Sequence, residues 1–98
     1  MKSSFSMREA QLKWGSVLKS ASQGRVVLTR YRQSWVALTP LKGRAMEIIR
    51  SVPLARYTQR AAEKMICELA ADIRANGKAV VIVTNWGRWV LMVPEARN

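Results

Sequence analysis

Arginine side chains are concentrated in a short polar stretch between two apolar runs, residues 26–28 and 36–38. Arg30 and Arg32 flank Tyr31 there, and alternation along a strand would place both guanidinium groups on one side. Two guanidinium groups on a turn can bind phosphates, or can contact guanine through paired hydrogen bonds in the major groove of DNA. The alternative is a solvated turn in which arginine serves solubility.

Other basic residues extend this candidate site. Lys2 and Ser3 belong to an N-terminal basic arm, which precedes a predicted helix start at Ser6 where backbone amides favour phosphate. Arg60 and Arg88 occupy related places in the second half. Acidic residues along a helix predicted between Thr58 and Gly77 would repel an anionic partner, so we expect the first half of the chain to make most of the contacts with DNA. The full set of predicted DNA-binding residues is Arg30, Arg32, Arg8, Lys13, Lys2, Ser3, Tyr31, Arg60 and Arg88.

The net charge of the chain favours a polyanionic partner. Lys and Arg number 17 against 6 Asp and Glu, which gives a net charge of +11 without any histidine. Neutralising phosphates releases condensed counterions, so such an excess is typical of nucleic-acid binding. Residues 1–52 carry 10 basic and 2 acidic side chains, whereas residues 53–98 carry 7 and 4, so the first half is the more cationic.

The sequence contains little that could support catalysis. It has no histidine, and it shows neither paired carboxylates nor metal-ligand spacing nor a glycine-rich phosphate loop. The single cysteine, Cys67, lies in an apolar helical pattern and is predicted to pack rather than to act as a nucleophile. We therefore expect no enzyme, no cofactor, no catalytic residue and no metal site.

Length and hydropathy indicate the setting in which the chain acts. Its 98 residues suit one compact domain, or two small halves that share a core. No apolar run approaches the ~18 residues that a membrane span needs, and a single cysteine cannot form an internal disulfide. We expect a protein of the reducing cytoplasm that does not enter a membrane.

Two segments of the chain repeat one pattern and would position the basic residues. Ser6 and Glu9 are spaced as a capping box, which predicts a helix from there to a left-handed stop at Gly24. A shift of 52 places aligns this segment with a second helix that starts at Thr58 and stops at Gly77. The apolar residues that align without a gap are Trp14, Val17, Leu18 and Ala21 with Ile66, Leu69, Ala70 and Ile73.

A β-hairpin is predicted after each helix, because runs of β-branched residues flank a short polar turn. The second strand of each hairpin begins with tryptophan and closes with proline, at residues 35–40 and 89–94. Trp14 and Trp35 are predicted to pack in the core, whereas Trp86, at a turn, is the tryptophan most free to be exposed. Apolar residues on both strand faces predict a sheet that is covered on both sides, or that meets a partner on one side.

The predicted fold class is therefore α+β, with two similar helix–hairpin units that form one compact domain and a sheet packed against helices. The first unit covers residues 1–52 and includes a short connecting helix over residues 41–50, which is broken before Pro53. The second, degenerate unit covers residues 53–98. A coincidence of small-domain patterns is the alternative to an internal duplication.

Three segments of the first copy share the pattern of a known family: Phe5-Ser6-Met7-Arg8-Glu9-Ala10 through Leu12, Val27-Leu28-Thr29-Arg30, and Val36-Ala37-Leu38-Thr39-Pro40-Leu41. They resemble the DNA-binding domain of the Phd/YefM antitoxins, and residues 57–94 form a weaker second match. The sequence departs from the family where Gln11 replaces an arginine and where Asn85 stands in the second copy at the position of Arg30. A second copy also occupies the place of the family's toxin-neutralising segment.

The resemblance implies a function in DNA binding. Family members form a two-fold dimer whose helix starts and basic hairpins meet operator DNA, so a tandem copy would make one chain a monomeric pseudo-dimer; a homodimer is the other arrangement. The predicted function is a sequence-specific regulator of transcription that binds double-stranded DNA, a repressor of a plasmid, phage or bacterial operon. The alternative is an antitoxin or other inhibitor that neutralises a protein partner.

Overall fold

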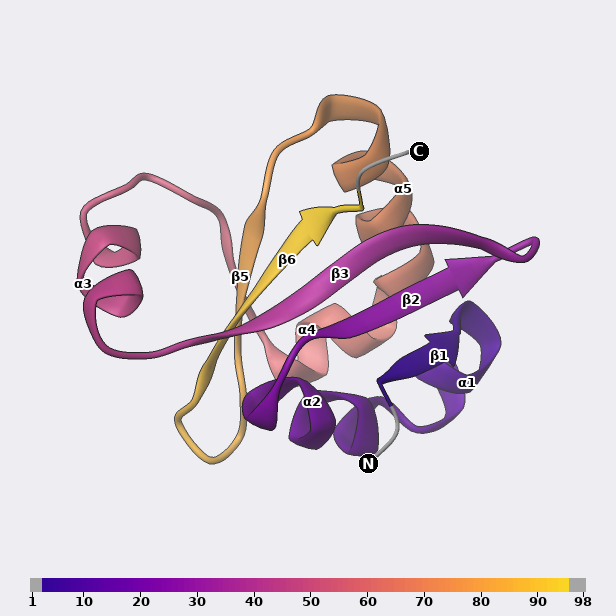
Figure 1. Cartoon of the computed structure of the whole chain (residues 1–98), viewed down its shortest axis with the longest axis horizontal. Helices are drawn as coiled ribbons and strands as arrows, with labels where there is room; N and C mark the ends of the chain where they lie inside the picture. Colours follow the sequence, from indigo (N-terminus) through magenta and orange to yellow (C-terminus); the bar gives the residue numbers. More distant parts are fainter. Residues whose placement is uncertain (1–2, 96–98) are drawn as a thin grey trace.

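The computed structural model describes residues 3–95 and contains a single mixed sheet of six strands, with five helices (Figure 1). The strands are β1 (Ser4–Ser6), β2 (Val26–Arg30), β3 (Gln33–Leu41), β4 (Arg56–Thr58), β5 (Val80–Val83) and β6 (Trp89–Pro94). The helices are α1 (Met7–Leu12), α2 (Trp14–Gln23), α3 (Arg44–Arg50), α4 (Gln59–Lys64) and α5 (Ile66–Asn76). The radius of gyration is 12.2 Å, close to the ~13 Å expected for a compact domain of about this length. The predicted α+β class is confirmed.

The strand order, β1-β2-β3-β6-β5-β4, is symmetric about the centre of the sheet. In each half a parallel edge strand, β1 or β4, lies beside an antiparallel hairpin, β2–β3 or β5–β6. Val26 pairs with Leu38 in the first hairpin, and Val80 pairs with Met92 in the second, so both strands repeat after 54 residues. Leu38 and Met92 pair with each other where β3 meets β6. Because these central strands are antiparallel, the two hairpin turns lie at opposite ends of the sheet.

The two edge strands have no counterpart in the sequence-based prediction. Each is three residues long, which is too short for the alternation of apolar and polar residues to show. Ser6 at the end of β1 pairs with Thr29, and Thr58 at the end of β4 pairs with Val83. The edge strands therefore place the start of α1 and of α4 beside the end of a hairpin strand.

Both long helices predicted from the sequence are divided in two, which corrects that prediction. The first divides at Lys13 (φ −132°, ψ 41°) and the second at Met65 (φ −127°, ψ 26°). Neither position carries proline or glycine, so helix propensity gives no warning. At the first division Trp14 buries its indole ring, and its Nε1 donates a hydrogen bond to the backbone oxygen of Gln59, 3.0 Å away in the other half. Packing between the halves accompanies the break.

The two glycine stops differ in backbone conformation. Gly77 is left-handed (φ 69°, ψ 12°), as predicted, and its N–H donates to the carbonyl of Ile73. Gly24 is extended (φ −177°, ψ 177°), so the prediction of a left-handed stop is wrong there. Residues with a side chain adopt that extended conformation readily, and the end of α2 therefore does not require glycine.

One apolar core fills the space between α1, α2, α4, α5 and one face of the sheet. The eight predicted helical residues are buried in it, together with Ala10 and Ala62; the eight are Trp14, Val17, Leu18, Ala21, Ile66, Leu69, Ala70 and Ile73. They pack with alternate strand residues, Val26, Leu28, Val36, Leu38, Val80, Ile82, Val90 and Met92. On the opposite face Ala37 and Val81 are buried, whereas Val27, Leu91 and Val93 are half-buried. Every buried helix side chain within residues 3–95 belongs to the first face, so cover or a partner for the second face remains a prediction.

The connecting helix α3 stands apart from the other helices (Figure 1) and buries none of its residues. It begins at Arg44 rather than at residue 41, because Leu41 is the last residue of β3 and pairs with Trp89. Its end at Arg50, before Pro53, agrees with the prediction. No helix within residues 3–95 combines the length and the apolar character that crossing a membrane requires.

Candidate nucleic-acid interface

The first hairpin turn holds its two central residues in the left-handed region. Tyr31 (φ 52°) and Arg32 (φ 62°) join β2 to β3 between the paired residues Arg30 and Gln33. Two consecutive positive φ angles define a type I′ turn, in which Asn-Gly or Asp-Gly is the usual choice. Residues with a β-carbon are destabilised there by about 1 kcal/mol or more each. Tyrosine and arginine therefore occupy this turn although their left-handed conformations destabilise it.

A depression of about 660 Å³, which we name the basic hollow, lies beside this turn. The turn supplies Arg30, Tyr31 and Arg32, and the first turn of α1 supplies Arg8. Four of the predicted residues are thus brought together. Arg30 and Arg32 share the hollow through the geometry of the turn rather than through strand alternation, which corrects the predicted reason. The other lining residues are Ser6, Met7, Gln11, Thr29 and Cys67.

Aromatic rings hold the guanidinium group of Arg30. Its central carbon lies 5.1 Å from the ring centroids of both Tyr31 and Trp35. Arg74 lies at the same distance from the ring of Trp35, which is half-buried and packs against the core as predicted. Stacking restricts the guanidinium group without neutralising its charge. The side chain is therefore positioned to meet a ligand.

The basic hollow also keeps its positive charge. Among residues 3–95, no carboxylate forms an ion pair with Arg8, Arg30 or Arg32. Arg25 provides the contrast, because it pairs with Glu95 at the far end of the chain. The hydrogen bond that Arg25 donates to the Glu95 carboxylate raises the pKa of the Arg25 guanidinium. An anion that reached the basic hollow would not have to displace an internal carboxylate.

The remaining predicted residues lie outside the basic hollow. Lys13 is exposed at the division between α1 and α2, and Arg60 is exposed in the first turn of α4. Ser3 is exposed, and its carbonyl accepts a hydrogen bond from a β2 amide. Arg88 is exposed at the second hairpin turn, at the other end of the sheet. Lys2 lies outside the described residues.

The start of α1 is occupied by its own capping box, as predicted. The amide of Glu9 donates to Oγ of Ser6 at 3.1 Å, and the amide of Ser6 donates to Oε1 of Glu9 at 3.1 Å. Side chains of this short helix therefore satisfy two of the amide donors at this end. The helix start does not strengthen the case for phosphate binding, which depends on the arginine side chains.

The second hairpin turn has a different construction. Residues 84–88 join β5 to β6, and Gly87 (φ 81°) takes the left-handed conformation. The amide of Thr84 donates to the carbonyl of Arg88 at 2.8 Å, and Oγ1 of Thr84 accepts from the amide of Arg88 at 2.9 Å. The amide of Asn85 donates to Oε1 of Gln59 at 3.0 Å. Hydrogen bonds thus fix this loop without left-handed residues that carry side chains.

A second cationic depression, which we name the Trp86 hollow, lies beside the second turn. It has a volume of about 500 Å³ and is lined by Lys19, Ser22, Gln23, Lys42, Trp86 and Arg88. The sequence indicated Arg88 as a contact and Trp86 as the exposed tryptophan, and 43% of the surface of Trp86 is exposed. It did not indicate Lys19 or Lys42. Both lie in the first half of the chain, so only the packing of the halves brings them to this turn.

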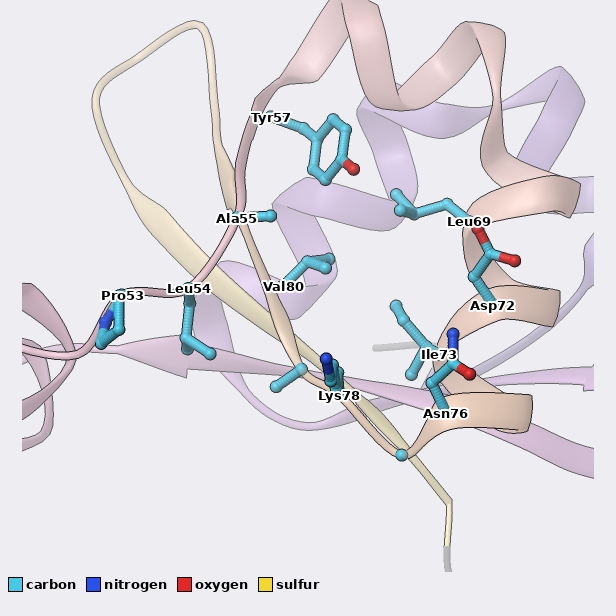
Figure 2. A pocket seen from close by; sticks show the side chains of 12 residues that line it. Pro53, Leu54, Ala55, Tyr57, Leu69, Asp72, Ile73, Asn76, Lys78 and Val80 are labelled. Carbon is cyan, nitrogen blue, oxygen red and sulfur yellow. The ribbon is translucent and has the colours of Figure 1, made fainter.

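A third depression, of about 550 Å³, has another character (Figure 2). Figure 2 shows side chains of α5, including Leu69 and Ile73, opposite the segment that leads into β4 and the start of β5. Most of the lining is apolar, and its charged residues are one carboxylate, Asp72, and one lysine, Lys78. This depression does not suit a polyanion.

No group of three or more histidine, cysteine, aspartate or glutamate side chains within residues 3–95 is placed to hold a metal ion. Cys67 is half-buried and packs against the core, as predicted, and its Sγ accepts a hydrogen bond from Nε2 of Gln11.

No family model, no curated protein and no solved structure matches this chain. The geometry and charge of the two cationic hollows are therefore the basis for inferring a function.

Proposed function

We propose that this chain is a regulator of transcription that binds double-stranded DNA, chiefly through the basic hollow. The observation that carries the proposal is the first hairpin turn, where Tyr31 and Arg32 remain in left-handed conformations that asparagine and glycine would adopt at lower cost. A turn selected for folding alone would not combine this strain with a basic side chain and an exposed aromatic ring. Backbone strain that the fold does not require is typical of functional sites.

Each residue of the basic hollow has a distinct role in the proposed contact. Arg30 presents a planar guanidinium group in a fixed orientation, which suits bidentate binding of a phosphate or of guanine. Arg8 and Arg32 flank it and bind backbone phosphates, while Tyr31 contacts the sugar or phosphate from the tip of the turn. Lys13, Arg60 and Arg88 add weaker phosphate contacts.

The symmetry of the sheet supports a pseudo-dimer of the kind that the resemblance to Phd/YefM antitoxins implies. β3 has nine residues and therefore spans about 30 Å at ~3.4 Å per residue. The two hairpin turns are separated by a similar distance, which approaches the ~34–36 Å between half-sites one helical turn apart on DNA. One chain would then reach two half-sites, the first through the basic hollow and the second only through weaker phosphate contacts such as that of Arg88. Such a regulator would act in the cytoplasm, as a repressor of a plasmid, phage or bacterial operon.

Fluorescence anisotropy with a labelled duplex from the region upstream of the chain's own gene tests this proposal. We expect tighter binding than to a random duplex, and a logarithm of affinity that falls with the logarithm of salt by about 0.9 for each phosphate contacted. Replacing Arg30 and Arg32 by alanine should reduce affinity while the thermal unfolding curve is retained. Light scattering should give the mass of one chain.

Two results would count against the proposal. Binding to the upstream duplex that is no tighter than to random DNA, and that is insensitive to Arg30 and Arg32, would favour an antitoxin or inhibitor that neutralises a protein partner. A mass of two chains would favour a homodimer over the pseudo-dimer.

A further inference from the structure

We propose that the Trp86 hollow binds one nucleotide whose base is not paired, with the base stacked on Trp86 and the phosphate bound by Lys19, Lys42 and Arg88. The site lies beside the second hairpin turn, at the opposite end of the sheet from the basic hollow. The proposal does not require that the basic hollow bind duplex DNA.

The four tryptophans differ in what their rings contact, and this difference identifies Trp86. Trp14 is buried and donates a hydrogen bond from its indole nitrogen. Trp35 and Trp89 each have two arginine guanidinium groups over the ring, at distances between 4.6 and 5.8 Å from the centroid. The indole of Trp86 has neither a hydrogen bond nor a cation over its ring within residues 3–95, and it is 43% exposed. Its ring is therefore available to a planar ligand.

The loop that carries Trp86 is already ordered for binding. Its neighbours Thr84, Asn85, Gly87 and Arg88 each take part in hydrogen bonds that close the loop or attach it to α4. Thr84 is buried, with 4% of its surface exposed. A ring on a rigid loop loses little conformational entropy when a ligand stacks on it.

The charge beside the ring indicates an anionic ligand. Lys19 at α2, Lys42 after β3 and Arg88 in the turn are exposed, and no described carboxylate lines the hollow or forms an ion pair with these three residues. A phosphate group can accept hydrogen bonds from all three cations. The volume of about 500 Å³ lies within the usual ~300–1,000 Å³ range of small-molecule sites.

A base and a phosphate together define the chemical class as a nucleotide. The base must be free of its own stack, because an aromatic side chain can cover a base only where the neighbouring base has left. Such a nucleotide can come from a single strand or can be a free mononucleotide. The chemistry of recognition is the same in both cases.

Two-dimensional NMR of the ¹⁵N-labelled full chain tests the proposal through the four indole N–H signals. Trp86→Phe identifies the Trp86 signal by its disappearance. We expect thymidine monophosphate and a five-residue oligothymidylate to shift that signal, and tripolyphosphate, which has no base, to leave it nearly unmoved. In anisotropy titrations Trp86→Ala should weaken oligothymidylate binding about tenfold, and Trp86→Phe should retain most of the affinity.

Ile48→Ala is the control, because Ile48 is an exposed apolar residue on α3 that lines neither hollow. It should leave oligothymidylate affinity within about twofold of the wild type. Binding of the oligonucleotide at least tenfold tighter than of the mononucleotide identifies a strand as the source, and equal binding identifies free nucleotide.

Three outcomes would overturn the proposal. Tripolyphosphate could move the Trp86 signal as far as the nucleotide does. Trp86→Ala could leave oligothymidylate affinity unchanged. Trp86→Ala could also weaken duplex and single-strand binding equally, which would assign Trp86 to a duplex interface. The salt-dependent duplex titration with Arg30 and Arg32 variants is a separate measurement, so the failure of either proposal is recognised independently.

Discussion

The two hairpins of the sheet have the same strand register and different turns. The pairs Val26–Leu38 and Val80–Met92 are equivalent, so the core packs alike in both halves. The first turn has two left-handed residues with large side chains, whereas the second uses Gly87 and a set of hydrogen bonds. Core packing constrains the strands in both halves, and the turns are free to differ. The strained turn is also the one that gathers arginines.

The two ends of the sheet therefore present different chemistry. At the first, Arg30 lies in a hollow with two other arginines and a tyrosine. At the second, the 54-residue repeat of the strands places Thr84, and not the predicted Asn85, at the position of Arg30. The cations come instead from Lys19 and Lys42 of the other half. An internal repeat with unequal ends can address two kinds of ligand, which is the basis of both proposals.

The largest expected effect is the loss of duplex binding when the basic hollow is neutralised. Arg8→Ala combined with Arg30→Ala should weaken duplex affinity by at least about 100-fold at ~0.1 M salt, because each charged contact contributes ~1.5–3 kcal/mol. The slope of log affinity against log salt should become shallower by about 2. A fluorescence anisotropy titration at several salt concentrations measures both quantities.

Arg60→Ala is the control in the second half, since Arg60 occupies the place of Arg8 and is also exposed. Its effect should be only a few-fold, as expected for a single screened phosphate contact. Equal losses from Arg60→Ala and from Arg8→Ala alone would mean that the halves contribute alike, and the contrast between the turns would then have no functional meaning.

The next effect separates stability from binding in the first turn. Tyr31→Asn together with Arg32→Gly creates the Asn-Gly pair that a type I′ turn favours, so the free energy of unfolding should rise by about 1–2 kcal/mol. Duplex affinity should fall about tenfold, because a charged contact is lost. Thermal unfolding and anisotropy on the same samples provide the two measurements.

Gly87→Ala is the corresponding change in the second turn. A β-carbon at Gly87 meets no atom within 4 Å, so the change tests the left-handed conformation alone. It should destabilise the fold by about 1 kcal/mol. If the Asn-Gly variant were less stable than the wild type, the first turn would not be strained, and the observation behind the proposed function would be removed.

The sequence predicted those features that depend on local spacing. The helical apolar residues, the two hairpins and the capping box of Ser6 and Glu9 follow from periodicity and cap chemistry, and the structure confirms them. The breaks at Lys13 and Met65 could not be predicted in this way, since packing between the halves accompanies them. The three-residue edge strands were too short to show a pattern.

The candidate sites show the same limit. Arg30, Tyr31 and Arg32 are neighbours in the chain, so their common position follows directly from the sequence. The Trp86 hollow combines residues 19 and 42 with residues 86 and 88, and only the folded sheet makes these segments adjacent. A site formed between two copies of a repeat has no signature within either copy.

A smaller effect distinguishes the two helix stops. Gly77→Ala should destabilise the fold by about 1 kcal/mol, because Gly77 is left-handed (φ 69°) although space for a β-carbon is available. Gly24→Ala should stabilise it by about 0.5 kcal/mol, because the extended backbone is retained and the unfolded chain loses freedom. Urea unfolding of both variants measures the difference. Destabilisation of similar size in both would contradict the distinction between the two stops.

The smallest expected difference lies between the two helix caps. Ser6 and Glu9 cap each other at α1, whereas Thr58 at α4 accepts a hydrogen bond from the amide of Ala61, whose side chain cannot return one. Ser6→Ala should therefore destabilise the protein by about 1 kcal/mol and Thr58→Ala by about 0.5 kcal/mol. The double variant Ser6→Ala with Glu9→Ala should be little less stable than Ser6→Ala alone if the two bonds act as one unit. If the losses in free energy of unfolding, measured by chemical denaturation, were additive, each cap hydrogen bond would act independently. The cap of α1 would then be no more cooperative than the cap of α4.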